Sequence, residues 1–378
     1  MKTISAAIIG ATGYAGVELA RLLCVHPNVE KLYLSSVSFE GQNITDIYPN
    51  LADCLNEKTD GTLLSADEAK SACDVLFTAL PNGLAEEYAY YCVKNGKKLI
   101  DLSADFRFHN EETFKKWYGS SWKYPAVHCE SVYGLPEYNR RKIKEARVVG
   151  NPGCYVTCAT LALIPALLRE IIDTSDDFPI IIDAKSGVTG AGRSATMTNQ
   201  FCECGEAFSA YKVGSHRHQP EIQKNCEVII ADRKGCAYSD CAPERKVSVI
   251  FTPHLVPMSR GIFSTIYARL SQTFTKEADN STSADEIAER IRQIYREHYK
   301  DERFVRVLKA NAQASTKNVR LSNFCDIQLY VVNGGKTLQI TSVIDNMQKG
   351  SSAQAVQNMN IMFGFDESAG IGNIPSAF

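Results

Sequence analysis

The 378-residue sequence predicts an α/β protein built from two domains. Up to about residue 150, short β-rich runs alternate with helical segments, a pattern typical of a parallel sheet with helices on both faces. After residue 154, several long strands appear with few helices, which indicates an α+β domain with a largely antiparallel sheet. The chain is also longer than single domains usually grow.

The first expected strand, residues 3–10, runs into a glycine-rich turn and then a helix. The turn reads Gly-Ala-Thr-Gly-Tyr-Ala-Gly over 10–16. Glycines in such a turn let the backbone approach a pyrophosphate, and the helix N-terminus supplies N–H groups to bind it. This placement predicts a Rossmann-like dinucleotide-binding domain. Its candidate cofactor contacts are Gly10, Thr12, Gly13, Tyr14, Ala15 and Gly16.

The second expected strand, 29–36, ends where an NAD enzyme would carry an acidic residue for the ribose hydroxyls. The chain has Ser35, Ser36 and Ser38 there instead. Hydroxyls without a carboxylate are compatible with a 2′-phosphate, so the sequence favours NADP over NAD. The alternative is an ordinary serine loop, because Glu40 lies close by and no basic residue stands in the turn.

Two further strands are expected within 73–81 and 96–107. In open α/β sheets the loops at the carboxyl ends of the strands face the cofactor, so Pro81 and Ser103 are candidate cofactor contacts. Arg107 closes the second loop and is placed to bind an anion. The alternative for Arg107 is a solvated surface arginine.

Cys154 follows Asn-Pro-Gly and precedes a long apolar helical run. A thiol titrates near ~8.5, and the positive end of a helix favours its thiolate. We therefore expect Cys154 to be a nucleophile at the junction of the two domains. Pro165, inside the apolar run, should kink or split the helix.

Two of the seven histidines, His216 and His218, lie in one polar, basic, glycine-flanked stretch. On an extended backbone their rings would point to one side, with Arg217 on the other, so a single cleft could receive both imidazoles. Either ring would then be available as a base for a thiol.

The second domain is expected to contain strands within 178–187, 246–257 and 261–271, and a hairpin over 327–345 that turns at Asn-Gly-Gly. One amphipathic helix is expected over 284–299. We expect the last helix to return to the first domain. The division is then 1–153 with 349–378 for the dinucleotide-binding domain, and 154–348 for the catalytic and oligomerisation domain.

The formal net charge is −2, without a long run of one sign, so the sequence lacks the footprint of a nucleic-acid binder and the substrate is expected to be a small molecule. No stretch is long and apolar enough to span a bilayer, which predicts a cytoplasmic protein. The thirteen cysteines predict reduced thiols. Neither Cys202 with Cys204 nor Cys236 with Cys241 has zinc-site spacing, so no metal is expected.

Eight motifs along nearly the whole chain carry a family resemblance. They are GATGYAG at 10–16, DLSADFR at 101–107, VYGLPE at 132–137, GNPGCY at 150–155, SGVTGAGR at 186–193, GSHRHQPEI at 214–222, FTPHLVPMSRGI at 251–262 and DNMQKGSSAQAVQN at 345–358. Together and in this order, they resemble N-acetyl-γ-glutamyl-phosphate reductases and, more distantly, aspartate-semialdehyde dehydrogenases. One departure is Val37, near which many relatives have an arginine.

The resemblance implies an acyl-phosphate reductase of L-arginine biosynthesis that forms a thioester on Cys154 and uses NADPH to reduce it to N-acetyl-L-glutamate 5-semialdehyde. His218 is the expected base and His216 the alternative. Asn346 joins the implied cofactor contacts. Arg107 would hold the leaving phosphate. The other implied substrate contacts are Arg193, Lys212 or Arg217 for the α-carboxylate, with Ser186, Tyr211 and Glu221.

The family also implies a homodimer or homotetramer. Two other functions remain open on the sequence. One is an aspartate-semialdehyde dehydrogenase, which would use the same chemistry on a shorter substrate. The other is a redox sensor that binds NADP without turnover.

Overall fold

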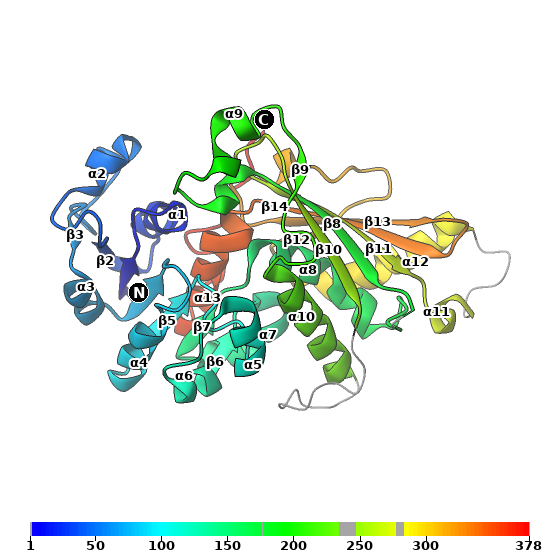
Figure 1. The fold of residues 1–378 in the computed structure, drawn as a ribbon, viewed down its shortest axis with the longest axis horizontal. Coiled ribbons are helices and arrows are strands. Elements are labelled where there is room, and N and C mark those ends of the chain that lie inside the picture. Colours follow the sequence, from blue (N-terminus) through cyan, green and yellow to red (C-terminus); the bar gives the residue numbers. More distant parts are fainter. Residues whose placement is uncertain (1, 176, 234–246, 277–282, 378) are drawn as a thin grey trace. The chain divides into compact units, whose positions relative to one another are not determined.

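The computed structural model describes residues 2–175, 177–233, 247–276 and 283–377 (Figure 1). The chain forms two compact units. Unit 1 comprises Met1–Gly153, Gly192–Ser194 and Met347–Ile374, and unit 2 comprises Cys154–Ala191, Ala195–Asn346 and Pro375–Phe378. Three residues, Gly192–Ser194, thus belong to unit 1 although the chain on both sides of them belongs to unit 2.

Unit 1 contains a seven-stranded sheet in the order β3-β2-β1-β4-β5-β7-β6. All neighbouring strands in it are parallel, as the sequence predicts. The order of the chain reverses between β2 and β4, on the two sides of β1, and this is where open α/β sheets bind ligands. The strands are β1 Ile4–Ile9, β2 Val29–Ser35, β3 Leu63–Leu64, β4 Val75–Thr78, β5 Lys98–Asp101, β6 Ser131–Tyr133 and β7 Val148–Gly150.

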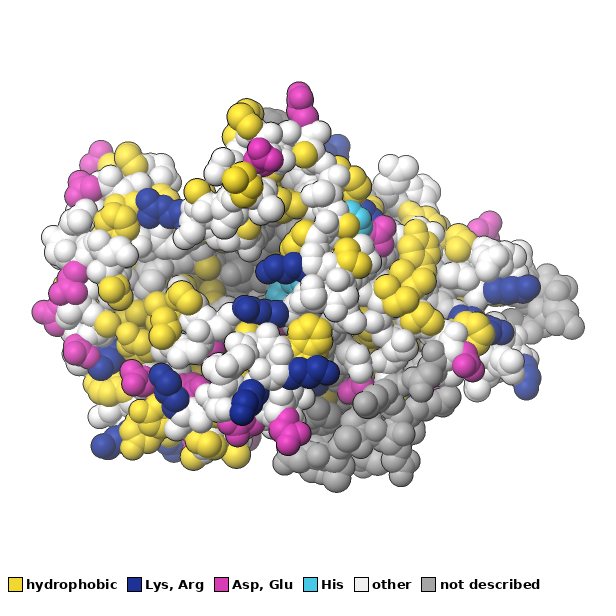
Figure 2. Space-filling view, in the orientation of Figure 1, with side chains coloured by type: hydrophobic (Ala, Val, Ile, Leu, Met, Phe, Trp, Pro, Cys, Tyr) yellow, Lys and Arg dark blue, Asp and Glu magenta, His cyan; other side chains and the backbone are white. Residues whose placement is uncertain are grey.

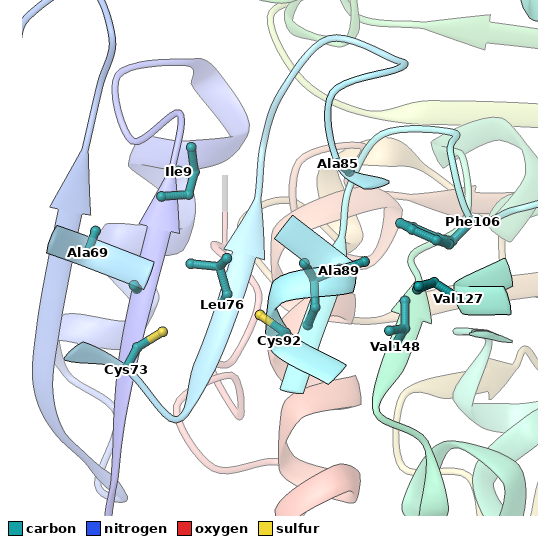
Figure 3. Close-up of a cluster of buried hydrophobic side chains, with 12 residues drawn as sticks. Ile9, Ala69, Cys73, Leu76, Ala85, Ala89, Cys92, Phe106, Val127 and Val148 are labelled. Carbon is teal, nitrogen blue, oxygen red and sulfur yellow. The ribbon is translucent and has the colours of Figure 1, made fainter. Parts of the chain in front are cut away.

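Helices cover both faces of this sheet. On one face, Ala7, Leu76 and Leu99 pack under α3, α4 and α6 in the apolar cluster of Figure 3. Helix α13 packs on the other face with α1 and α7. The helices of unit 1 are α1 Tyr14–Cys24, α2 Ile44–Ile47, η1 Pro49–Leu51, α3 Ala66–Ala72, α4 Glu86–Lys94, α5 Glu111–Tyr118, α6 Pro125–Glu130, α7 Pro136–Glu145, the π-helical turn η5 Gln348–Ser352 and α13 Ala353–Phe363.

Unit 2 contains a second seven-stranded sheet in the order β12-β13-β14-β11-β8-β10-β9. Two neighbouring pairs are parallel and the others antiparallel, which confirms a largely antiparallel sheet. Its strands are β8 Ile180–Ser186, β9 Ser209–Ala210, β10 Val249–Leu255, β11 Ile262–Arg269, β12 Val305–Val307, β13 Cys325–Val332 and β14 Thr337–Ile344.

The helices of unit 2 include one that sequence analysis missed, α10, which packs along α8 (Figure 1). The sequence of α10 does not indicate a helix, because its third residue is a proline, Pro220, and it has no clear apolar stripe. The helices of unit 2 are α8 Cys154–Leu168, η2 Val188–Ala191, η3 Met197–Asn199, α9 Phe201–Cys204, α10 His218–Arg233, α11 Gln272–Lys276, α12 Ala284–Tyr299 and η4 Thr316–Asn318.

The sequence predicts that Pro165 kinks or splits its helix, and the expectation of a split is wrong. The helix continues from Cys154 to Leu168. Proline removes the N–H that would bond to the carbonyl four residues earlier, which belongs to Leu161. The hydroxyl of Tyr299, from α12, donates a hydrogen bond to that carbonyl and replaces the missing donor. Tolerance of the proline therefore depends on a tertiary contact that the local sequence does not reveal.

Side chains of both charges are scattered over the visible face of the molecule, among apolar ones (Figure 2). In the part of the chain that the structure describes, no helix combines the length and apolar character that a membrane crossing requires. The stretch with Cys236 and Cys241 lies outside the described residues. Among the residues described, no cluster of His, Cys, Asp and Glu could hold a metal ion, and no disulfide forms.

Candidate active site

The glycine-rich turn in unit 1 has the shape that a dinucleotide requires. Gly10 has φ +89°, and a Cβ on it would lie 2.4 Å from the Ala79 carbonyl oxygen. A Cβ on Gly16 would lie 2.1 Å from the Gly10 carbonyl oxygen, so α1 can approach β1 only with glycine there. Helix α1 begins at Tyr14, and its N-cap residue, Gly13, has no side chain to cap it. The backbone N–H groups of this first turn can therefore bind a pyrophosphate.

The serine turn after β2 adjoins the glycine turn. The Thr12 hydroxyl and the Ser36 hydroxyl form a hydrogen bond of 2.8 Å. The carbonyl of Ser35 accepts the N–H groups of Gly10 and Ala11, at 3.0 and 2.9 Å. Ser35 and Ser36 are buried, whereas Ser38 is exposed. Hydrogen bonds thus join the glycine turn to Ser35 and Ser36, two of the residues predicted to contact the cofactor.

A buried carboxylate fixes the loop after β5. The N–H and the hydroxyl of Ser103 donate to Asp101, at 3.0 and 2.6 Å, and the Thr78 hydroxyl donates to it at 2.8 Å. Burial, together with the nearby charge of Asp105, raises the pKa of Asp101 to about 6. Ser103 therefore holds the loop through Asp101. Pro81, in the loop after β4, is exposed.

Arg107 is buried, so its interpretation as a solvated surface arginine is wrong. Its Nε donates to the Asn151 carbonyl at 2.8 Å and its Nη2 to the Leu102 carbonyl at 2.9 Å. The side chain of Asn151 is also held, because its Nδ2 donates to the Ser351 carbonyl at 3.1 Å and its Oδ1 accepts from Asn358. Arg107 thus fixes the backbone three residues before Cys154.

Cys154 is the first residue of α8 and is partly exposed. The positive end of the helix favours negative charge on its sulfur. The next residue, Tyr155, is buried; its hydroxyl donates to the His254 carbonyl at 3.2 Å and accepts from the Tyr211 hydroxyl at 3.2 Å. Burial raises the pKa of Tyr211 to about 12, and the charge of Cys154 contributes to that shift. Tyr211 therefore lies close enough to Cys154 for the two side chains to interact electrostatically.

The two histidines lie together, but not on an extended backbone, so that part of the sequence analysis is wrong. His218 is the first residue of α10, and His216 lies in the turn before it. Nδ1 of His216 accepts the backbone N–H of His218 at 3.1 Å. Their ring centroids are 4.8 Å apart, and both rings meet the edge or face of the Tyr155 ring, at 5.8 and 5.9 Å. Tyr155 thereby links the imidazoles to the residue beside it, Cys154.

The surroundings of His216 disfavour its protonated form. Burial lowers the pKa of His216 to about 3, helped by the charges of His218, Lys212 and Arg217 and opposed by Glu221. His216 is thus neutral at physiological pH. With Nδ1 accepting a hydrogen bond, its proton lies on Nε2.

The other residues implied for the substrate are distributed over both units. Ser186, at the end of β8, is buried and its hydroxyl donates to the Gly187 carbonyl at 3.0 Å. Glu221 is buried on α10. Lys212 and Arg217 are exposed, and Lys212 has φ +47°. Arg193 is grouped with unit 1, where its Nη1 donates to the Thr12 carbonyl at 3.1 Å.

Asn346, implied as a cofactor contact, is buried in unit 2. Its Oδ1 accepts the N–H of Gly261 at 2.7 Å, and its Nδ2 donates to the Thr189 hydroxyl at 3.0 Å. The side-chain amide thus holds the segments around residues 189 and 261 together.

Tyr155 and Lys224 belong to the site, although no role for either is predicted from the sequence. Lys224 lies three residues after Glu221 on α10, and burial lowers its pKa to about 8 against the opposing charge of Glu221. The signal for Tyr155 was its position directly after the nucleophile, whereas Lys224 gave no signal because α10 was not predicted. Cys158, one turn after Cys154, is buried and its thiol donates to Ser342. Burial raises the pKa of Cys158 to about 11, as expected for a packing residue.

The fold and the site define the class of protein. A family model described as "Semialdehyde dehydrogenase, NAD binding domain" matches residues 5–146, and "Semialdehyde dehydrogenase, dimerisation domain" matches 154–346. Among solved structures, aspartate semialdehyde dehydrogenase II from Vibrio cholerae is similar, with a TM-score of 0.68 and 15% identity over 96% of this chain and 99% of that one. This likeness shows the two-domain semialdehyde dehydrogenase fold.

Curated relatives narrow the class. N-acetyl-gamma-glutamyl-phosphate reductase of Clostridium beijerinckii is 47% identical over 98% of both chains. The enzyme of the same name from Brachyspira hyodysenteriae is 44% identical over 99% of this chain and 100% of the relative. The chain belongs to the N-acetyl-γ-glutamyl-phosphate reductase family.

Proposed function

We propose that this chain reduces N-acetyl-γ-glutamyl phosphate to N-acetyl-L-glutamate 5-semialdehyde, with release of phosphate, as a step of L-arginine biosynthesis. The observation that carries the proposal is the arrangement around Tyr155. It follows Cys154 at the start of α8, and its ring touches both His216 and His218. Family membership over the whole chain assigns a substrate to this arrangement.

Cys154 performs the first chemical step. Its thiolate attacks the acyl carbon, the bond from that carbon to the phosphate oxygen breaks, and phosphate leaves a thioester on the sulfur. Bound NADPH supplies the hydride that reduces such an acyl group. When the carbon–sulfur bond then breaks, the semialdehyde leaves and the cysteine thiolate is regenerated.

His218 is the proposed base. Its neighbour, His216, has its Nδ1 occupied by the N–H of His218 and a pKa of about 3, which makes it a poor proton acceptor. His216 is therefore proposed to orient His218 and to present its Nε2 proton to the substrate. A positioned base contributes roughly 10²–10⁴-fold to the rate.

The proposed substrate contacts differ in their exposure to solvent, since Lys212 and Arg217 are exposed and Arg107 is buried. Lys212 and Arg217 are exposed cations and are the proposed contacts of the α-carboxylate. The Tyr211 hydroxyl lies close enough to Cys154 for the charge of that residue to raise its pKa. For Arg107, we propose that it acts on the leaving phosphate while holding the Asn151 carbonyl. Bidentate geometry suits arginine to both anions.

NADP is the proposed cofactor, bound at the glycine turn and the serine turn of unit 1. Support comes from the Gly10 and Gly16 geometry and from the exposed Ser38. The loop containing Ser103 and the exposed Pro81 complete the proposed set.

A homodimer or homotetramer is proposed through the open face of the unit 2 sheet. Ile250 pairs with Ile181 in register, and Ile181 pairs with Tyr267, so three apolar side chains form one row across β10, β8 and β11. Their exposed fractions are 47%, 41% and 37%. Exposed apolar rows of this kind mark interaction sites. Sedimentation of Ile181→Lys would then show a smaller assembly than that of the wild type.

A cytoplasmic location is also part of the proposed function.

One assay pair tests the function. Phosphate-dependent NADP reduction is measured with N-acetylglutamate semialdehyde and with aspartate semialdehyde, and we expect turnover with the first. Turnover only with the second would make the chain an aspartate-semialdehyde dehydrogenase. Absence of turnover with both would favour an NADP-binding redox sensor.

The same assay tests the mechanism. Cys154→Ser should abolish turnover and leave NADPH binding intact. Cys158→Ala, one helical turn away, should retain turnover, because that thiol is buried against Ser342. Undiminished activity in Cys154→Ser would rule out the thioester.

A further inference from the structure

Gly192–Ser194 is the only stretch of the described chain between residues 154 and 346 that is grouped with unit 1. Within it, Arg193 makes the contacts. Its Nη1 donates to the Thr12 carbonyl at 3.1 Å, and its guanidinium lies over the rings of Tyr48 and Phe39, at 5.2 and 5.7 Å. The Tyr48 hydroxyl donates to the same Thr12 carbonyl at 2.9 Å. Arg193 is therefore anchored beside the glycine turn.

The turn that follows β2 is where a Rossmann unit meets the ribose carrying the 2′-phosphate. In this chain, residues 35–40 are Ser-Ser-Val-Ser-Phe-Glu, which include no cation. Val37 is 80% exposed and offers no donor from its side chain. Hydroxyls alone leave the two negative charges of a 2′-phosphate without a counter-charge.

Arg193 supplies a cation at this place from a distant part of the sequence. The Thr12 residue that accepts its Nη1 also bonds through its own hydroxyl to Ser36, at 2.8 Å. Phe39, under the guanidinium, belongs to the same turn as Ser38. Arg193 is thus connected to the serine turn twice. It contacts Thr12, which bonds to Ser36, and it contacts the ring of Phe39.

The state of the guanidinium also suits a ligand. Arg193 is exposed, and it forms no ion pair with a carboxylate among the residues that the structure describes. A guanidinium has five N–H donors, of which the Thr12 carbonyl takes one. Stacking over two rings restricts the side chain before a ligand arrives, which reduces the entropy lost on binding.

We propose that Arg193 binds the 2′-phosphate of NADP and gives this chain its preference for NADP over NAD. The inference rests on the proposed cofactor. It also replaces the expectation that Arg193 binds the α-carboxylate of the substrate, since its contacts are with Thr12, Phe39 and Tyr48 of unit 1.

The test compares binding of adenine nucleotides with and without the phosphate, by calorimetry on the full chain. Arg193→Gln should weaken NADP⁺ and 2′,5′-ADP about 10- to 100-fold, the loss typical of a charge-assisted hydrogen bond. NAD⁺ and 5′-AMP should bind as to the wild type. Lys31→Gln is the matched control, because it removes the same charge from β2 at an exposed lysine that bonds to the Glu57 carbonyl.

A second variant tests the same idea by rescue. Val37→Arg, added to Arg193→Gln, should restore most of the affinity for 2′,5′-ADP, because position 37 is exposed in the same turn. Rescue would also show that loss of the Arg193 side chain does not prevent folding.

Three outcomes would overturn the inference. Equal weakening of NADP⁺ and NAD⁺ would make Arg193 a structural residue. Unchanged affinity for 2′,5′-ADP, with a higher KM for the acyl phosphate, would return Arg193 to the substrate. Equal affinity of the wild type for 2′,5′-ADP and 5′-AMP would remove the NADP preference itself, while the thioester chemistry, tested with Cys154→Ser, would stand or fall separately.

Discussion

Nδ1 of His216 accepts the backbone N–H of His218, at 3.1 Å. The side chain of one histidine thereby accepts the first N–H of the helix that begins with the other. The arrangement fixes the His216 tautomer and the start of α10 together, and so it places both imidazoles against the ring of Tyr155. Two residues with the same side chain are thus given different tasks by one hydrogen bond.

The two histidines should respond differently to substitution. His218→Asn should lower kcat by roughly 10²–10⁴-fold with little change in NADPH affinity, since it removes the proposed base. His216→Asn should cost less, because an asparagine oxygen can still accept the His218 N–H. Steady-state kinetics and calorimetry on both variants provide the comparison. A larger loss of kcat in His216→Asn would reverse the assignment.

Acid should destabilise the fold through His216. Its pKa is lowered from 6.5 to about 3. Between these values the unfolded chain binds a proton there and the folded chain does not, so stability is lost as the pH falls from about 6.5 towards 3. The slope from this group is at most about 1.4 kcal/mol per pH unit.

NMR titration of the imidazole signals checks this directly. The signal that disappears in His216→Asn should keep its neutral position down to about pH 4. In the same variant, the free energy of unfolding should decrease less steeply with falling pH than in the wild type. A midpoint near 6.5 for that signal would contradict the prediction.

Tyr299→Phe should cost about 1–3 kcal/mol of stability, the cost of leaving a buried carbonyl without a donor. The carbonyl belongs to Leu161, whose ordinary helical donor is missing because residue 165 is proline. Tyr295→Phe is the control. It removes a hydroxyl that donates to the Ala162 carbonyl at 2.7 Å, but that carbonyl keeps its position opposite the N–H of residue 166.

A double-mutant cycle isolates the cause. In a Pro165→Ala background, the new N–H can reach the Leu161 carbonyl, so Tyr299→Phe should cost no more than Tyr295→Phe. Denaturant unfolding of the four variants measures this. If Tyr299→Phe costs the same in both backgrounds, its hydroxyl does not replace the missing donor.

Gly16→Ala should destabilise unit 1 by about 1–3 kcal/mol, because its Cβ would lie 2.1 Å from a backbone oxygen, that of Gly10. Gly13→Ala provides the contrast. A Cβ there would lie 3.5 Å from the same oxygen, an ordinary contact, and φ is already −75°. Thermal unfolding without nucleotide should separate the two variants, and a similar melting temperature for both would contradict the close approach.

The parts of the fold that the sequence predicted are those in which local pattern and final structure agree. Alternating strands and helices gave the parallel sheet, and the capping box of Ser283 and Glu286 lies at the start of α12, where the apolar period also begins. The start of α8 at Cys154 followed from the Pro-Gly turn and the apolar run.

What the sequence did not predict depends on contacts made by distant residues. Helix α10 lacks an apolar stripe because it packs along α8 with buried polar groups such as Glu221 and Lys224. Pro165 needed Tyr299 from another helix. Arg193 lies in unit 1 because only three residues, Gly192–Ser194, are grouped with that unit, and no hydrophobic periodicity in the sequence indicates this.

Every side chain of α8 from Tyr155 to Leu167 is buried, and only the cysteine that opens the helix reaches the surface in its first three turns. Almost any substitution in this helix would disturb the packing. Substitutions in α8 itself can therefore seldom change the reactivity of Cys154. Differences in reactivity between relatives should accumulate instead in the more exposed stretch around residues 212–217. There a new side chain can alter the local field at small cost to the fold.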